Sequence, residues 1–110
     1  MTHRARGFIL IELMIVVAII AILAAIALTA YHQYQIRAAE GACLAEVKNY
    51  ASFALATLQM GGTPLALPLE ACLAGAAKTE FGTDTTATPQ LPGTRISTCD
   101  MDTATCTTAP

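Results

Sequence analysis

The side chains able to act in acid–base or nucleophilic catalysis are few and lie far apart in this sequence. The chain has two histidines, and its serines are Ser52 and Ser97. The acidic residues beyond position 69 form no paired arrangement of the kind that catalytic sites use; they are Glu70, Glu80, Asp84, Asp100 and Asp102. We therefore predict that the protein is not an enzyme and needs no cofactor.

Glu12 is a carboxylate inside a long apolar run. From Phe8 to Ala30 the sequence reads FILIELMIVVAIIAILAAIALTA, in which Glu12 and Thr29 are the only residues that are not apolar. A charged side chain inside an apolar span costs about 2.5 to 3.5 kcal/mol on insertion scales. Glu12 therefore either reaches toward the lipid headgroups, as in a plain membrane anchor, or has a partner of opposite charge.

The apolar run has the length of a membrane-spanning helix. Residues 8–30, rising about 1.5 Å each, form a helix of about 35 Å, which exceeds a hydrocarbon core of about 30 Å. Arg4 and Arg6 precede the run, so the positive-inside rule predicts a cytoplasmic N-terminus and an exported C-terminal part. The run is too long for the apolar region of a secretory signal peptide.

Composition argues against two further classes of protein. Of the 110 residues, 55% are hydrophobic and 13% charged, with a mean hydropathy of +0.54, which disfavours intrinsic disorder. The net charge of −2 and the absence of a basic block disfavour a nucleic-acid binder.

The four cysteines all lie in the part expected to be exported. They form no Cys-x-x-Cys pair and have no supporting histidines, so a zinc site is disfavoured. A calcium site at Asp84, Asp100 and Asp102 is also disfavoured, because the further ligands of a calcium loop are missing. An even number of cysteines in a small exported head indicates disulfides, and four cysteines allow three pairings.

The N-terminal sequence resembles that of type IV pilin precursors. RGFILIELMIVVAIIAILAAIA has the family's basic leader ending in Gly, followed by Phe and, four positions on, Glu. The resemblance covers about the first thirty-seven residues, through Tyr31, Tyr34 and Arg37, and more loosely the C-terminus with its cysteines. Ile9 replaces the usual Thr of the family. Thr29 stands where many pilins have a helix-breaking Pro, so we expect an unbroken helix here in the monomer.

This resemblance implies how the N-terminus is processed. Residues 1–7 are a leader that a prepilin peptidase removes by cleavage between Gly7 and Phe8, and Phe8 is then N-methylated. In the family, the glutamate corresponding to Glu12 compensates the new amine, chiefly that of a neighbouring subunit during assembly. Elementary electrostatics agrees, because a helix N-terminus carries about half a positive charge and a free amine adds a full one.

The fold class expected is α+β, a pilin fold. One helix over residues 8–60 carries a small antiparallel sheet on its C-terminal half. Residues 8–30 form the transmembrane and filament-core part, and residues 31–62 the amphipathic half, with apolar residues at three- and four-residue spacing up to Gly61-Gly62. Residues 63–110 form the disulfide-linked head.

Within the head, the sequence indicates two to four strands. Residues 69–77 favour a short helical turn, because Leu69, Cys72 and Leu73 share a helical face. TRISTCD, after Pro92-Gly93, favours a strand; residues 100–103 favour a turn, and TATCTT the partner strand.

We expect the disulfides Cys43–Cys72 and Cys99–Cys106. The first ties the connecting segment to the helix. The second spans few residues across the expected turn and resembles the C-terminal loop of many pilins.

The resemblance implies a structural subunit of a type IV pilus. Its precursor is a single-pass protein of the inner membrane, and the processed chain polymerises into a surface filament used for adhesion, twitching motility or uptake. Its partners are identical subunits, the prepilin peptidase, an inner-membrane assembly platform and, before assembly, the lipid bilayer. Loss of Arg4 and Arg6 leaves four of the six basic residues against eight acidic ones, so direct nucleic-acid binding is not expected.

Two alternatives stay open at the level of sequence. A secretion-system pseudopilin or a minor pilin is distinguished by a calcium-dependent head fold. A bitopic membrane anchor with a small extracytoplasmic binding head belongs to another class. It predicts no cleavage after Gly7 and no loss of function when Glu12 is neutralised.

Overall fold

The computed structural model describes residues 2–76 and 80–110. The elements follow in the order α1 (Thr2–Gln59), β1 (Cys72–Gly75), β2 (Thr85–Pro89), β3 (Ser97–Asp100) and β4 (Thr105–Thr108). The chain divides into two compact units, Met1–Gln33 and Tyr34–Pro110, and α1 contributes to both. The expected α+β fold class, one long helix with a small antiparallel sheet, is confirmed.

The first unit consists of the apolar part of α1. Every large apolar side chain from Phe8 to Leu28 is more than half exposed. By length and composition, α1 is the one helix in the described residues that is long and apolar enough to cross a membrane. An apolar surface of this extent is stable against lipid or against other apolar chains, and unstable in water.

α1 begins at Thr2 rather than at Phe8. The residues ahead of Phe8 contain no proline, and their single glycine costs a helix only about 1 kcal/mol. Met1 and the side chains of residues 2–7, which belong to the expected leader, lie outside the described residues. The helix is unbroken at Thr29, as expected, and the Thr29 hydroxyl donates a hydrogen bond to the carbonyl of Ile26 (2.9 Å).

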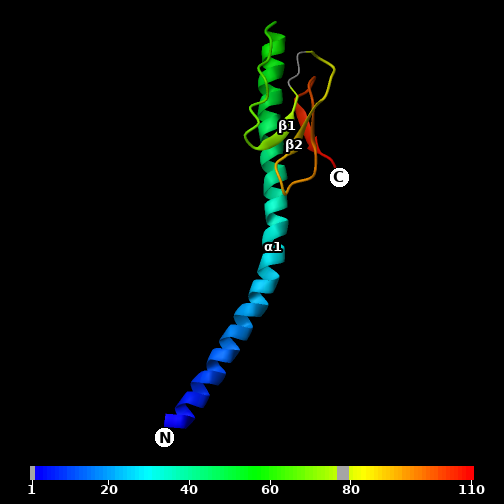
Figure 1. The fold of residues 1–110 in the computed structure, drawn as a ribbon. Helices are drawn as coiled ribbons and strands as arrows, with labels where there is room; N and C mark the ends of the chain where they lie inside the picture. Colours follow the sequence, from blue (N-terminus) through cyan, green and yellow to red (C-terminus); the bar gives the residue numbers. More distant parts are fainter. Residues whose placement is uncertain (1, 77–79) are drawn as a thin grey trace. The chain divides into compact units, whose positions relative to one another are not determined.

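The core of the second unit lies between the C-terminal part of α1 and one face of the sheet (Figure 1). The buried residues of α1 recur at three- and four-residue spacing and so form one helical face; they are Cys43, Val47, Tyr50, Ala51 and Ala54. The segments beyond α1 supply Leu67, Cys72, Ala87, Cys99 and Met101. The amphipathic pattern therefore identified the helix face that the head covers.

The sheet is an antiparallel meander of four strands over the described residues, in the order β1-β2-β3-β4. On β2 the residues Thr85, Ala87 and Pro89 are buried, because alternate side chains point toward α1. β1 pairs with β2 with a register irregularity between Cys72 and Ala74. The prediction of two to four strands is confirmed by these four.

α1 ends as the glycine pair predicts. Gly61 has a φ of 78°, a left-handed conformation that glycine adopts without steric cost. The Gly61 N–H donates to the carbonyl of Leu58 (3.0 Å), and the Gly62 N–H to that of Thr57 (2.9 Å). These two bonds form a Schellman motif, which satisfies carbonyls that the helix end leaves unpaired.

In the head, one secondary-structure prediction is wrong and two are confirmed. The helical turn expected over residues 69–77 is wrong, because Cys72–Gly75 is the strand β1, paired with β2; Ala77 lies outside the described residues. TRISTCD contains β3, and TATCTT contains β4, as expected. The turn between them falls on residues 101–104, one residue later than predicted.

Candidate functional site

Phe8 and Glu12 lie one helical turn apart in the exposed apolar part of α1. Residues at this spacing share a helix face. Between Phe8 and Ala30 the sequence contains no basic residue. In a chain that begins at Phe8, the positive charge that can compensate Glu12 locally is therefore the N-terminal amine, either of the same chain or of another copy.

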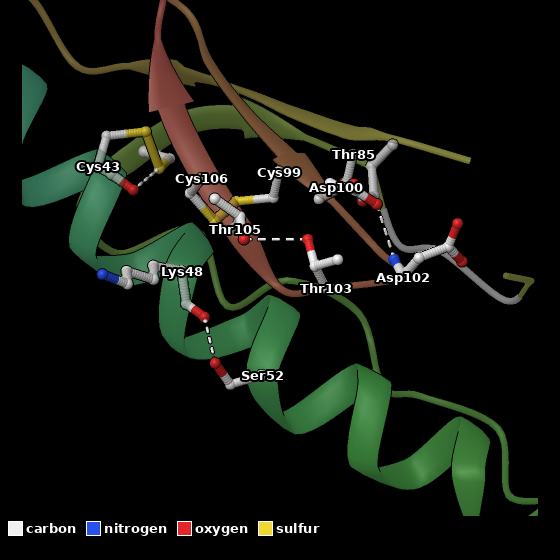
Figure 2. The surroundings of a disulfide bond; sticks show 12 residues. Cys43, Lys48, Ser52, Thr85, Cys99, Asp100, Asp102, Thr103, Thr105 and Cys106 are labelled. Atoms are coloured by element: carbon white, nitrogen blue, oxygen red, sulfur yellow. Dashed lines mark hydrogen bonds between the residues drawn. A yellow bond between two sulfur atoms is a disulfide. The ribbon is translucent and has the colours of Figure 1, made fainter. Parts of the chain in front are cut away.

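Two disulfides tie the described part of the head together. Cys43–Cys72 joins α1 to the first residue of β1. Cys99–Cys106 joins β3 to β4, where these two residues face each other in the register (Figure 2). These are the pairings expected from the sequence, and the described residues contain no free cysteine.

Glu40 fastens the loop between β2 and β3 to α1. Its side chain is only 9% exposed, and its Oε1 accepts hydrogen bonds from the backbone N–H groups of Thr94 and Arg95, at 3.1 Å each. The Nε of Arg95 lies 3.9 Å from Oε2. The N–H of Thr94 is the main cause that lowers the pKa of Glu40; burial opposes it, and the N–H and charge of Arg95 add to it.

Glu46 fastens the segment before β1 in the same manner. Its Oε1 accepts a hydrogen bond from the N–H of Glu70 (3.0 Å), and its Oε2 accepts one from the N–H of Ala71. The sequence analysis missed both Glu40 and Glu46. A signal existed for Glu40, since it lies three residues before Cys43 and seven before Val47, on the buried face of α1.

The acids of the β3–β4 turn cap backbone groups. The Asp102 N–H donates to Oδ1 of Asp100 (2.8 Å), and the Gly82 N–H donates to Oδ1 of Asp102 (2.9 Å). Figure 2 shows Asp100 and Asp102 beside the turn. Among the described side chains, those of residues 8–76 and 80–110, no three metal-ligating groups gather into a candidate metal site. The arrangement is that of turn-forming acids.

The two serines occupy separate places in the head. The Ser52 hydroxyl donates to the carbonyl of Lys48 on the exposed side of α1 (3.1 Å). Ser97 is fully buried on β3, and its hydroxyl has no hydrogen-bond partner among the described residues.

Comparison with known proteins gives matches at the N-terminus. Residues 2–28 match the prokaryotic N-terminal methylation motif. Over 48 residues, 42% of the chain, the sequence is 65% identical to a type IV major fimbrial protein, FimA, of Dichelobacter nodosus, covering 30% of that protein. Over a stretch of the same length it is 60% identical to the type IV major pilin protein PilE1 of Neisseria gonorrhoeae, covering 29% of it.

The chain thus matches less than a third of the length of these relatives. No solved structure matches it. The matched region includes the apolar part of α1 with Glu12, and the fold around it is a long helix carrying a small antiparallel sheet. Residues 2–28 of this protein thus carry the prokaryotic N-terminal methylation motif, and the chain is similar over 48 residues to type IV major fimbrial and pilin proteins.

Proposed function

We propose that this protein is a structural subunit of a type IV pilus, which polymerises through α1 into an extracellular filament. The observation that carries the proposal is the surface of α1 from Phe8 to Leu28, whose large apolar side chains are all exposed, inside the segment that matches the methylation motif. Such a surface needs lipid before assembly and other copies of itself afterwards. Adhesion, twitching motility or uptake are then properties of the whole filament.

Processing prepares the N-terminus. Hydrolysis of the Gly7–Phe8 peptide bond by a prepilin peptidase releases residues 1–7 with a carboxylate on Gly7 and leaves a free amine on Phe8. A methyl donor then N-methylates this amine, which retains its positive charge. Arg4 and Arg6 depart with the leader, so the positive charge next to the apolar run becomes a single amine.

Glu12 selects the neighbour during assembly. Inside a bundle of apolar helices the dielectric constant is low, so an unpaired carboxylate is costly and an opposite charge is strongly attracted. The Phe8 amine of an incoming subunit supplies that charge. The pairing fixes the axial position of each new helix relative to the last, in addition to neutralising Glu12.

The cell biology follows from this topology. The precursor spans the inner membrane once, through residues 8–30, with the head outside the cytoplasm, where an oxidising compartment permits both disulfides. An assembly platform in the inner membrane extracts the processed subunits into the filament. The exposed heads form its outer surface, where acids outnumber bases, so broad phosphate binding along the shaft is disfavoured.

The first test is the N-terminal sequence and intact mass of the chain in material sheared from the cell surface. We expect a chain that starts at N-methylated Phe8 and weighs four hydrogens less than its reduced form. A chain that starts at Met1 and stays in the membrane fraction contradicts the proposal and supports the bitopic anchor.

A second test neutralises the charge of Glu12. Glu12→Gln should leave cleavage and membrane insertion intact but reduce the sheared filament, because the Phe8 amine loses its partner. Glu80→Gln, which removes one carboxylate from the exposed surface of the head, is the matched control. Filament yields that are equal for the two variants would show that Glu12 has no part in assembly.

Loss of head folding on calcium removal would favour the pseudopilin instead.

A further inference from the structure

A groove of about 440 Å³ opens on the head between α1 and the segment that precedes β1. Its walls include the apolar side chains of Tyr50, Phe53, Leu65 and Pro68, with the carboxylate-bearing Glu46 also in its lining. Phe53 is 61% exposed although it lies next to the packed core. The groove is therefore an apolar recess with a negative charge in its lining.

The walls of this groove are fixed in place. The Glu46 carboxylate accepts hydrogen bonds from the backbone N–H groups of Glu70 and Ala71. These residues follow in sequence the wall residues Leu65 and Pro68. The Cys43–Cys72 disulfide ties the following residue to α1. The groove is thus preformed, and an occupant does not have to order it.

A second feature of the head has the complementary chemistry. In the loop between β2 and β3, Leu91 is 81% exposed and Arg95 is 57% exposed. The Gly93 N–H donates a hydrogen bond to the carbonyl of Gln90 (2.9 Å). The carboxylate of Glu40 accepts hydrogen bonds from the next two N–H groups, those of Thr94 and Arg95. Leu91 is therefore an exposed apolar knob on a fixed turn, and the cation Arg95 follows four residues later in the same loop.

We propose that the Leu91 loop of one subunit inserts into the groove between α1 and Leu65 of a second copy of this chain. The apolar knob fits the apolar walls, and the positive charge of Arg95 complements the negative charge of Glu46 in the lining of the groove. Arg95 keeps its own Glu40, because a guanidinium has five donors and can serve two carboxylates. The contact rests on the proposed function, since it takes another pilus subunit as the partner.

The symmetry of the contact agrees with polymerisation. Knob and groove are different parts of the same unit, so the contact is heterologous, the type that builds an open helical filament when the rotation between copies does not close a ring. On α1 the knob is held at Glu40 and the groove is centred near Tyr50. Ten residues of helix correspond to about 15 Å, so contacting copies are staggered by about that distance along α1.

Photo-cross-linking tests the contact in assembled filaments. A photoreactive amino acid replaces Leu91 in the full-length chain, and filaments are grown from cells that carry a mixture of ¹⁴N- and ¹⁵N-labelled subunits. We expect cross-links between differently labelled copies, from position 91 to peptides that contain Phe53 or Leu65. The same amino acid at Leu73, which is 60% exposed on β1, is the control and should not reach these peptides.

The outcomes separate this contact from the proposed function. Position 91 could instead cross-link elsewhere on the neighbour, to a different protein or to lipid. Any of these results contradicts the proposed contact but does not contradict the proposed function as a pilus subunit. A wild-type chain that forms no filament overturns both.

A substitution gives a second, independent readout. Leu91→Asp places a carboxylate against Glu46 in an apolar groove, and it should lower the temperature at which sheared filaments dissociate. Leu73→Asp adds the same charge on β1 and should leave that temperature unchanged. The unfolding midpoint of each purified subunit shows that the heads still fold. Equal dissociation temperatures for the two variants overturn the contact.

Discussion

Glu40 and Glu46 each bind two successive backbone N–H groups of a loop, and each does so from α1. Loops carry N–H groups that no sheet or helix satisfies, and these need other partners when they pack against the core. Hydrogen bonds to an ionised acceptor are about twice as strong as neutral ones. Single carboxylates on α1 therefore help to dock both loops.

The lowered pKa of Glu40 makes the docking of the β2–β3 loop dependent on pH. The folded pKa of Glu40 is lower than its ordinary value, so its contribution to stability is complete above the ordinary value and is lost as the pH falls through the folded pKa. Glu40→Gln should therefore be less stable than wild type at pH 7, and the difference should shrink in acid. Chemical denaturation at pH 7 and pH 3 measures it.

The matched control for this prediction is Glu80→Gln, since Glu80 is exposed. It should follow the wild-type dependence on pH. If Glu40→Gln also follows the wild-type curve, Glu40 does not couple protonation to folding.

Two buried hydroxyls on the sheet differ in whether they have a partner. Ser97 has none among the described residues, whereas the hydroxyl of Thr85 donates to the carbonyl of Ala76 (2.8 Å). Ser97→Ala should hold or raise the free energy of unfolding, by up to about 1 kcal/mol, and Thr85→Val should lower it by about 1 kcal/mol. Urea titration compares them, and a Ser97→Ala loss as large as that of Thr85→Val would indicate a partner for Ser97.

At the scale of an element, the end of α1 depends on one residue with a left-handed backbone conformation. Gly61 is left-handed, whereas Gly41 lies in the middle of α1 with open space where a Cβ would be. Gly61→Ala should lower the free energy of unfolding of the head by about 1 kcal/mol, because an alanine resists this conformation. Gly41→Ala should raise it by about 0.5 to 1 kcal/mol, because alanine has the better helix propensity.

Thermal unfolding of the two glycine variants checks this pair. Opposite shifts of the midpoint are expected. A Gly61→Ala shift in the same direction as Gly41→Ala contradicts the assignment of the Schellman motif.

At the scale of the whole molecule, disulfides supplement a small core. Cys43–Cys72 closes a loop with a sequence separation of 29, and Cys99–Cys106 one with a separation of 7. In the chain-entropy model the longer loop contributes about 3.5 kcal/mol and the shorter about 2.5 kcal/mol. The double variant Cys43→Ala/Cys72→Ala should therefore lose more stability than Cys99→Ala/Cys106→Ala, as measured by denaturant midpoint and slope. The reverse order would show that the loop length does not govern the stabilisation.

The two halves of the chain differ in what makes them stable. The head has a core of its own, between α1 and the sheet. The first unit, from Phe8 onward, exposes its large apolar side chains, so its stability depends on what surrounds it. This contrast agrees with the proposed function, in which a subunit moves from a bilayer into a filament.

Much of the chain could be predicted because its signals are local. A run of apolar residues of membrane-spanning length, with Glu12 inside it, is visible without any tertiary contact. The end of α1 at Gly61-Gly62 follows from the steric freedom of glycine. The pairing Cys99–Cys106 could also be predicted, because the two residues lie close in sequence across a turn.

The remaining features depend on residues that are distant in sequence. Residues 72–75 carry apolar spacing that a helix can also use, and they form a strand because β2 supplies hydrogen bonds and α1 a disulfide. Glu40 and Glu46 look like ordinary surface glutamates of a helix until the loops bring N–H groups to them. The sequence by itself determined the apolar helix and where it ends, since these follow from composition and local sterics. Only the tertiary structure decided how the head is docked on α1, because that depends on contacts across 24 to 55 residues that no local pattern encodes.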